Sequence, residues 1–391
     1  MKRLAGESLV FLMCVFSLLF FTFFIPGSTS AAEKAIPGSL DEKVAQPNAA
    51  FDADKMGDMS DYNPSTIVSP TGDTIKIAVV ASFSGPAAAN GEFYWNIAQW
   101  VAHDYNKRGG IWVDGKKKLI QVIKADHQSK PDVCRKVCER MALQEKVHVF
   151  MGTDGSHMMK IINEAANWYY MNGGKASVPV VIWGIINRLG EQAAQHSQAL
   201  HSLFAHVPGL KVVMPATPYD AKGLMISAIR DPNPVIYIDH RLLCRQEGEV
   251  PKELYAVEIG KGIVRRKGRD VTIVGISCMA IEAQRAAEQL EGSGIDAEVI
   301  DLRSAKPIDE GLILRSVKKT GRLVIADGGW KTCGWAAEIA ALASESAWKF
   351  LKAPIRRITL PDCPAPASAV LEKVYYRSSA DIVKAVRQVL K

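Results

Sequence analysis

The sequence predicts an α/β protein built from parallel-sheet βαβ units. Short runs rich in β-branched and aliphatic residues alternate with helical stretches from residue 75 onward. Glycine and proline residues separate these segments, which is typical of the loops between strands and helices. Apolar residues make up 48% and charged residues 23% of the 391 residues, as in folded globular proteins. The chain shows no internal repeat, heptad pattern or low-complexity tract, which excludes solenoids, coiled coils and fibres.

The N-terminus has the pattern of an export signal, which we assign to residues 1–32. Lys2 and Arg3 precede an apolar stretch from Leu9 to Ile25, and Ser30–Ala32 supplies the small residues of a cleavage site. The stretch is slightly shorter than the roughly 18–20 residues that span a bilayer. We therefore expect cleavage and an exported, periplasmic protein, with an uncleaved N-terminal anchor as the alternative.

The charge pattern and hydropathy argue against a nucleic-acid partner and against a further membrane-spanning segment. The net charge of +7 is not arranged as basic residues interleaved with aromatic ones, so we expect no nucleic-acid partner. No segment beyond the signal is long and apolar enough to cross a membrane.

Residues 33–72 are rich in Ala, Asp, Pro and Ser without periodicity, and we expect a flexible extension. Cys134 and Cys138 lie four apart on a predicted helix, a spacing that is too wide for a disulfide.

The first half of the chain predicts an alternating series of strands and helices. The expected strands are 75–83, 119–126 and 147–152, and the expected helices are 91–106 and 131–145. Two loops of small residues, Ser84–Gly91 and Gly152–Ser156, follow strands and precede helices. Because free N–H groups at a helix N-terminus favour an anion, these loops are candidates for binding a carboxylate. Ordinary βα turns are the alternative interpretation.

The motifs of this half, in their order, resemble a known family. KIAVVASFSGPAAANG, DYNKRGGI and VFMGTDGSH resemble the branched-chain-amino-acid-type solute-binding proteins of ABC transporters. The resemblance covers residues 75–156, the opening of the first lobe, and no second lobe or hinge follows. It implies a partial periplasmic-binding-protein-like lobe at residues 73–158. In that lobe Ser84, Thr153 and Ser156 would bind a small carboxylate or amino-acid ligand.

The second half of the chain again predicts α/β structure. The expected strands are 178–184, 234–239, 270–277, 297–303 and 322–329, and the expected helices are 219–229, 281–291 and 335–348. Pro307 and Asp309 open a further helix, because both residues are favoured in a first helical turn. The part from about residue 258 contains enough strands and helices to fold as a complete domain.

Long motifs in this half resemble a second family. AAQHSQALHSLFAHVPGLKVVMPATPYDAKGL, AIRDPNPVIYIDHR and SVKKTGRLVIADGGWKTCGWAAEIAA resemble the β subunit of the thiamin-diphosphate-dependent 2-oxo acid dehydrogenase E1 component, of the pyruvate or branched-chain type. The resemblance covers residues 161–391. It implies a partial pyrimidine-binding, transketolase-like domain at 159–257 and a complete transketolase C-terminal-like domain at 258–391.

The second resemblance also implies an activity, cofactors and partners. The family carries out oxidative decarboxylation of a 2-oxo acid and transfers the acyl group to a lipoyl-bearing E2. Thiamin diphosphate with magnesium would be shared with an E1 α subunit, which binds the diphosphate and the metal. Such proteins are cytoplasmic, a location that conflicts with the export signal.

Candidate site residues follow from the same resemblance. His196 matches the HSQ histidine of the family's active-site channel, where an imidazole can move a proton or stabilise an anion. Val180, Ala228, Asp231 and Asn233 match positions that bind a structural potassium ion, largely through main-chain oxygens. From spacing alone, His196 is better explained as a packed or surface histidine, and AIRDPNP as a turn that ends a helix.

Two departures from the family's pattern predict impaired activity. Trp183 stands where an arginine is usual, which removes a charge near the site. The family's N-terminal segment, with the glutamate that activates the cofactor, has no counterpart here, so decarboxylation is expected to fail. The two resemblances meet at about residues 156–161. The alternatives are therefore an exported solute-binding fragment or a chimeric fusion product with neither activity.

Overall fold

The computed structural model describes residues 62–63, 67–85, 88–113, 115–151, 159–186 and 188–391. The chain forms two compact units, residues 1–159 and 160–391. The expected signal peptide lies outside the described residues, as does most of the expected extension. Within the described part, no helix has both the length and the apolar character needed to cross a membrane.

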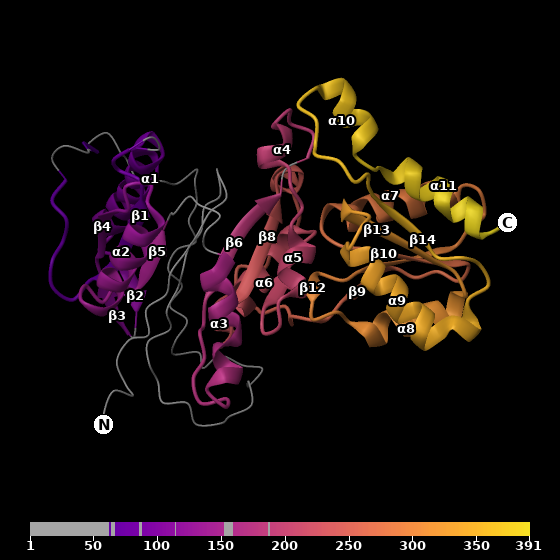
Figure 1. Ribbon diagram of the computed structural model, residues 1–391, viewed down its shortest axis with the longest axis horizontal. Helices are drawn as coiled ribbons and strands as arrows, with labels where there is room; N and C mark the ends of the chain where they lie inside the picture. The colour runs from indigo at the N-terminus through magenta and orange to yellow at the C-terminus, as the bar shows by residue number, and fades with distance from the viewer. Residues whose placement is uncertain (1–61, 64–66, 86–87, 114, 152–158, 187) are drawn as a thin grey trace. The chain divides into compact units, whose positions relative to one another are not determined.

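The first unit contains a small parallel sheet of three strands (Figure 1). Its elements are β1 (Ile75–Ala81), α1 (Ala88–Lys107), β2 (Ile111–Val113), β3 (Lys116–Lys118), β4 (Ile120–Asp126), α2 (Pro131–Leu143) and β5 (Val149–Met151). The strand order is β4-β1-β5, and both neighbours of β1 run parallel to it. Buried residues of β1, β4 and α1 form its core. Cys134 and Cys138 are buried on α2 as free thiols, in agreement with their spacing.

The second unit begins with a four-stranded sheet that is mostly parallel. Its elements are α3 (Met159–Met171), β6 (Val181–Ile186), α4 (Ala193–His196), α5 (His201–His206), β7 (Lys211–Val213), α6 (Pro218–Arg230), β8 (Val235–His240) and η3 (Arg241–Arg245). The strand order is β12-β7-β8-β6. β12 (Ser304–Lys306) comes from the later part of the chain and pairs antiparallel with β7, so the two halves of the unit share a sheet.

The later part of this unit is a five-stranded sheet with helices on both faces. Its elements are β9 (Ile263–Arg266), β10 (Val271–Gly275), α7 (Cys278–Glu291), β11 (Ala297–Asp301), α8 (Glu310–Thr320), β13 (Leu323–Trp330), α9 (Trp335–Ala347), η4 (Trp348–Phe350), β14 (Arg356–Leu360), α10 (Ala369–Tyr375) and α11 (Ser379–Val389). The order is β14-β13-β10-β11-β9, with only β9 antiparallel to its neighbour. Figure 1 shows α7 and α11 on one face and α8 and α9 on the other.

Burial on both faces explains why the central strands are continuously apolar. Every residue of β10 is buried, and α7 and α11 pack their small and aliphatic side chains on it and its neighbours.

Capping residues determine where two of the helices begin. Thr217 caps α6 by accepting a hydrogen bond from the N–H of Asp220, and Ser378 and Asp381 form a capping box on α11.

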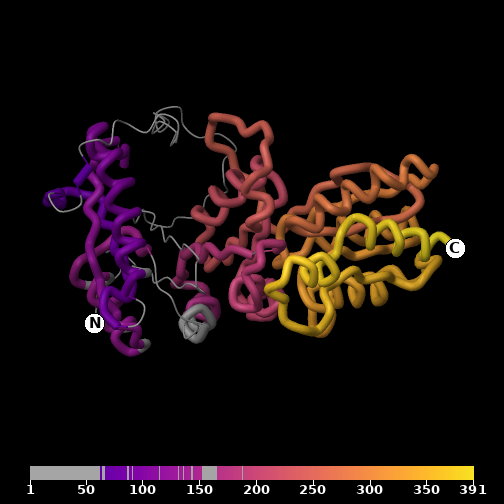
Figure 2. Tube along the Cα trace, turned by 90° about the horizontal axis from the view of Figure 1, so that it is seen from above, coloured from indigo at the N-terminus to yellow at the C-terminus, as the bar shows by residue number. Residues whose placement is uncertain are grey.

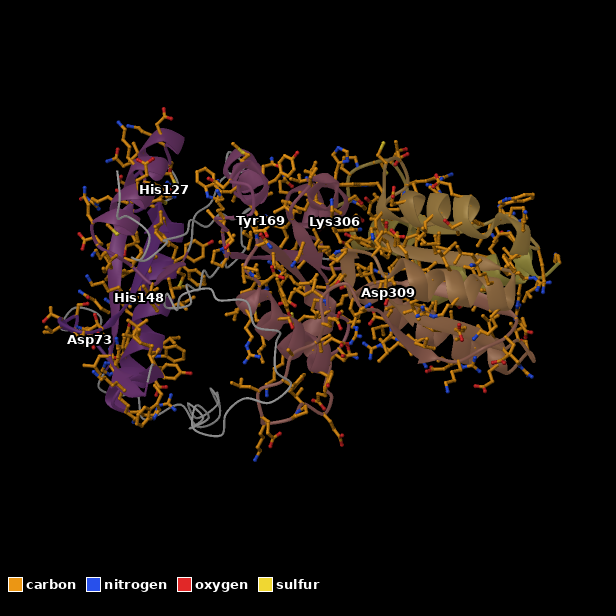
Figure 3. All side chains as sticks on the ribbon, turned by 90° about the horizontal axis from the view of Figure 1, so that it is seen from below. Asp73, His127, His148, Tyr169, Lys306 and Asp309 are labelled. Carbon is orange, nitrogen blue, oxygen red and sulfur yellow. The ribbon has the colours of Figure 1, made fainter. Side chains whose placement is uncertain are left out.

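Four charged side chains join the two halves of the second unit, which appear as adjoining lobes in Figure 2. Asp220 of α6 pairs with Arg265 of β9 and with Arg303, and Arg265 also pairs with Asp301 of β11. Both carboxylates are buried, with exposures of 1% and 0%. Lys306, labelled in Figure 3, adds two hydrogen bonds to main-chain oxygens at the end of α5. These contacts fix the relative placement of the two halves around the candidate site.

The strands and helices expected from sequence are present in the described residues, with ends shifted by a few positions. Shorter elements without a strong apolar pattern were not expected; they include the β2–β3 hairpin, β9, β12, β14 and α10. The boundaries proposed for domains at 73–158, 159–257 and 258–391 remain a prediction.

Candidate active site

The candidate site is built around the segment that joins β6 to α4 and carries His196. We call residues 188–196 the His196 loop. Three of its non-glycine residues, Leu189, Glu191 and Ala193, have φ values of 55° to 56°. Positive φ is unfavourable for residues with a side chain, and such residues persist only where the surroundings hold them. The loop is therefore maintained by contacts from outside itself.

Arg188 holds the start of the loop. Its side chain is buried, and its Nη1 lies 3.4 Å from the Met279 sulfur and 3.7 Å from the Cys278 sulfur. Nη2 donates to the main-chain oxygen of Arg377, and the guanidinium lies 5.5 Å from the centre of the Tyr376 ring. All four partners belong to the later half of the unit. One side chain thus connects the loop to that half.

Two further contacts hold the part of the loop that precedes α4. The carboxylate of Glu372, on α10, accepts hydrogen bonds from the backbone N–H groups of Gly190 and Glu191. The Arg241 guanidinium donates to the side-chain oxygen of Gln192 at 2.6 Å. The whole segment before α4 is fixed by side chains that lie far from it in sequence.

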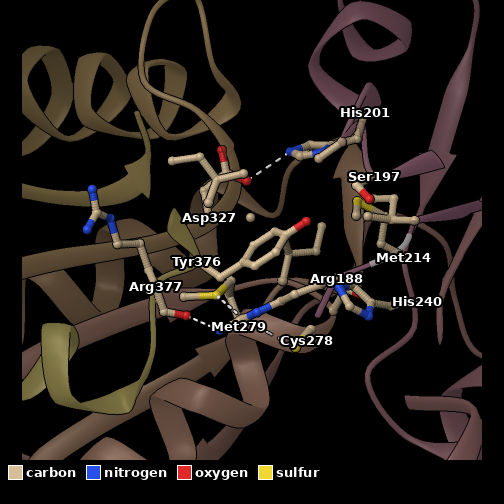
Figure 4. A pocket seen from close by; sticks show the side chains of 16 residues that line it. Arg188, Ser197, His201, Met214, His240, Cys278, Met279, Asp327, Tyr376 and Arg377 are labelled. Carbon is tan, nitrogen blue, oxygen red and sulfur yellow. Dashed lines mark hydrogen bonds and ion pairs between the residues drawn. The ribbon is translucent and has the colours of Figure 1, made fainter. Parts of the chain in front are cut away.

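A small cavity lies beneath the loop, between the two halves of the second unit (Figure 4). It has a volume of about 30 Å³, room for about two water molecules. Its polar lining includes Ser197, His201, His240, Ser277 and Asp327. The side-chain oxygen of Ser277 and Nδ1 of His201 have no protein partner among the described residues, which favours ordered water here. The cavity is too small for a cofactor.

A buried hydrogen bond between a histidine and a carboxylate crosses this cavity. Nε2 of His201, on α5, lies 2.9 Å from Oδ1 of Asp327, on β13, and both side chains are at most 1% exposed. Burial raises the pKa of Asp327. His201 and the N–H groups of Gly329 and Ala336 outweigh that effect and hold the pKa below its usual value. The pair therefore contains an ionised carboxylate that links α5 to β13.

Two neighbouring residues at the end of β8 have pKa values shifted mainly by burial. Burial raises the pKa of Asp239 to about 6, although a hydrogen bond of 2.7 Å from the Trp183 indole opposes the shift. Burial, together with the charge of Arg188, lowers the pKa of His240 to about 3. His240 is therefore neutral at pH 7. Trp183, at a position where an arginine was expected, thus acts as a neutral donor to a buried acid.

His196 is the last residue of α4 and is half-buried. The next residue, Ser197, lines the cavity, whereas His196 does not. An imidazole at this position is held by a fixed loop, which is a requirement for a group that moves a proton or stabilises an anion. The role of His196 remains a prediction.

The residues expected to bind potassium lie at one edge of the earlier half. Val180 accepts a hydrogen bond of 2.8 Å from the N–H of Val235, and Ala228 accepts one of 3.3 Å from Asp231. Asn233 donates its N–H to Oδ1 of Asp231. The other oxygen of Asp231 pairs with Lys211. A potassium ion there would share Asp231 with an ammonium group, and the assignment stays a prediction. Among the described residues, no group of three or more His, Cys, Asp and Glu side chains is placed to hold a metal.

The residues expected to bind a solute are only partly described. Thr153 and Ser156 lie outside the described residues. The Ser84 hydroxyl donates a hydrogen bond of 2.6 Å to Asp126, which also accepts from the N–H groups of Phe83 and Gln128. Since Ser84 is bound to an anionic side chain, a ligand carboxylate at this point would meet electrostatic repulsion. This arrangement explains Ser84 as part of an ordinary βα turn.

Sequence reasoning missed Arg188, Glu372 and Asp327. Asp327 is a charged residue inside an otherwise buried strand, and that pattern is a usable signal for a buried ion pair. Arg188 and Glu372 offer no local signal, because their partners lie about 90 to 190 positions away in sequence.

Two family models match the chain. The pyrimidine binding domain of transketolase matches residues 140–246, and the C-terminal domain of transketolase matches residues 260–382. The candidate site lies between these two regions, with the His196 loop in the first and Asp327 and Glu372 in the second.

Curated relatives match a similar part of the chain. The β subunit of acetoin:2,6-dichlorophenolindophenol oxidoreductase from Cupriavidus necator is 46% identical over 232 residues, which are 59% of this chain and 69% of the relative. The corresponding subunit from Bacillus subtilis is 42% identical over 60% of this chain and 69% of its own length. The pyruvate dehydrogenase E1 component subunit β from Rickettsia felis is 43% identical over 59% of this chain and 70% of its own length.

A solved structure with the same fold is a split-gene transketolase, described as an inactive β4 tetramer. It aligns with a TM-score of 0.51, 24% identity, 68% of this chain and 90% of its own chain. At this identity the likeness supports the fold alone. The comparisons give no support to a solute-binding segment, an ABC transporter role or a fusion.

The predicted location is wrong. We expected an exported, periplasmic protein from the apolar N-terminus. The relatives are instead pyruvate dehydrogenase E1 β subunits, one of them named as mitochondrial, and nothing in the comparisons indicates export.

The same relatives establish which family the chain belongs to. The chain covers more than two thirds of subunits that are over 40% identical to it, and it has both transketolase-type domains in the order expected. This chain belongs to the family of E1 component β subunits of the pyruvate and acetoin dehydrogenase type.

Proposed function

We propose that the chain acts as the β-type subunit of a thiamin-diphosphate-dependent E1 component that processes pyruvate, a branched-chain 2-oxo acid or acetoin. The observation that supports this proposal is the loop that carries His196, which Arg188 and Glu372 connect to the later half of the unit. An E1 α subunit and a lipoyl-bearing E2 are the proposed partners. The α subunit would supply the binding groups for the diphosphate and magnesium.

The described residues do not fit one part of the family's cofactor site. Thiamin diphosphate, when bound, supplies the carbon nucleophile of the reaction, and by resemblance a β-subunit carboxylate activates it. The buried carboxylates around the His196 loop are already engaged: Asp239 by Trp183, Asp327 by His201, and Glu372 by backbone N–H groups. None of these three is available to the cofactor ring. We therefore derive no catalytic step through the cofactor.

In this proposal the chain assembles as a β subunit but turns over poorly. The resemblance assigns the activating glutamate to a segment that the matched residues do not include. His196 would still form part of the channel that a lipoyl group enters, and potassium bound at Val180, Ala228, Asp231 and Asn233 would stabilise the earlier half.

A turnover assay tests this function. The full chain is mixed with the α subunit that partners the Cupriavidus necator β subunit, thiamin diphosphate and magnesium, and dichlorophenolindophenol reduction is followed with acetoin or pyruvate. The authentic β subunit is the positive control. We expect a complex with turnover at least 100-fold below that control, a loss typical of a removed general acid or base. Turnover close to the control would contradict the proposed impairment, and absence of a complex would contradict the β-subunit role.

A further inference from the structure

We infer that Glu372 is a positioning residue for the His196 loop. The inference rests on the proposed function, because that function gives His196 its importance. It adds a residue of the later half, on α10, to the groups that set the geometry of the site.

The contacts of Glu372 are unusual for a buried carboxylate. The residue is 2% exposed. Oε1 accepts from the N–H groups of Gly190 at 3.3 Å and Glu191 at 3.1 Å, and Oε2 accepts from Glu191 at 3.2 Å. No basic side chain in the described part of the chain forms an ion pair with it. A buried carboxylate is costly unless it is well bonded, and here the bonds all come from the loop backbone.

The loop needs such support at this point. Glu191 lies between Leu189 and Ala193, and all three have positive φ. Arg188 fixes the start of the loop, and Gln192 is held through Arg241. Glu372 is the contact that holds the two backbone N–H groups in between. A carboxyl group is suited to this, because its two oxygens can accept from both N–H groups at once.

The helix that carries Glu372 is itself anchored. The Tyr375 hydroxyl donates to the main-chain oxygen of Cys363 at 2.8 Å and accepts from the Trp330 indole at 3.1 Å. Tyr375 and Tyr376 are buried, whereas Val370 and Val374 are more than 70% exposed. α10 therefore presents Glu372 and Tyr375 to the rest of the unit, and it holds the carboxylate on a fixed support.

Hydrogen–deuterium exchange of the full chain tests the inference without any need for turnover. We compare the Glu372→Ala and Glu372→Gln variants with Glu282→Gln, a matched control. Glu282 is also a buried carboxylate that accepts a backbone N–H, that of Ser379 at 2.8 Å; unlike Glu372 it pairs with an arginine, Arg285, and no hydrogen bond among the described residues links it to the loop. Glu372→Gln keeps the shape and one acceptor oxygen, so it provides a folded variant if Glu372→Ala fails to fold.

We expect peptides covering residues 188–197 to exchange about tenfold faster in Glu372→Ala, with a smaller increase in Glu372→Gln. Glu282→Gln should leave these peptides unchanged. The rate at which diethyl pyrocarbonate modifies His196 should change in the Glu372 variants and not in the control. Unchanged exchange in the Glu372 variants, or an equal increase in the control, would overturn the inference.

The result is separable from the proposed function. Failure to bind an α subunit, with loop exchange still dependent on Glu372, would count against the β-subunit role alone. Binding to an α subunit with loop exchange independent of Glu372 would count against the positioning role alone.

Discussion

Asp239 and His240 are adjacent titratable residues, and burial shifts their pKa values in opposite directions. For Asp239 the folded-state pKa of about 6 lies above the value of about 3.9 expected when unfolded. The protonated acid is thus favoured in the folded state. Its contribution to stability is present below about pH 4 and is lost as the pH rises to about 6. For His240 the folded state favours the neutral imidazole. Its contribution to stability is present above about pH 6.5 and is lost as the pH falls towards 3.

The Asp239→Asn variant tests whether burying the ionised carboxylate of Asp239 destabilises the fold. The amide keeps an oxygen for the Trp183 indole and carries no charge to bury. We expect it to be more stable than the wild type by about 1–2 kcal/mol at pH 8, after allowance for partial exposure, and about equal at pH 4. Urea unfolding at the two pH values provides the measurement. If the variant were instead less stable than the wild type at pH 8, the ionised carboxylate would have to be stabilised by a partner that the structure does not show.

For single residues, the sequence indicates which side chains are candidates for the site, but not which residues they contact. The sequence points to His196 through the resemblance of its motif to a family. Trp183 was noticed only as a missing charge, because the acid that it bonds lies 56 positions away. Burial and pairing decide the chemistry of such residues, and neither is encoded within a short window of sequence.

Elements differ in how strongly their sequence specifies them. β10 and β13 are predictable because strands buried on both faces are mostly apolar. β9 and β12 were missed because edge strands are short and carry polar residues. The seven-residue helix α10 has little pattern of its own, yet it carries Glu372. The fold was thus more predictable than the site, whose parts come from the least specified elements.

The charged cluster between α6 and β9 provides a test at the scale of elements. Asp220→Asn removes the buried carboxylate that pairs with both Arg265 and Arg303. Breaking a buried ion pair leaves uncompensated charge, so we expect a loss of about 2–4 kcal/mol in the free energy of unfolding.

The matched control is Asp296→Asn. Asp296 also pairs with two arginines, Arg266 and Arg269, but Arg269 is 86% exposed and Asp296 is 31% exposed. We expect a loss of about 1 kcal/mol or less for this variant, because solvent screens exposed pairs. Equal losses for the two variants in urea unfolding would mean that the buried cluster does not hold the two halves together.

The whole molecule consists of two compact units, and the family membership rests on the second. Residues 160–391 contain the candidate site and most of the matched sequence, and their sheets are completed within that unit. We therefore predict that a fragment of residues 160–391 unfolds at the same temperature as this unit does in the full chain. Differential scanning calorimetry of both proteins measures this. A fragment that is unfolded, or markedly less stable, would show that residues before 160 complete its core.

Assembly with an α subunit is the central claim, and size-exclusion chromatography with light scattering tests it most directly. The full chain is mixed with the α subunit of the Cupriavidus necator acetoin enzyme, and the authentic β subunit serves as control. The account predicts a complex that contains both chains in equal numbers. Separate elution of the two chains, under conditions where the authentic β subunit forms its complex, would contradict the account.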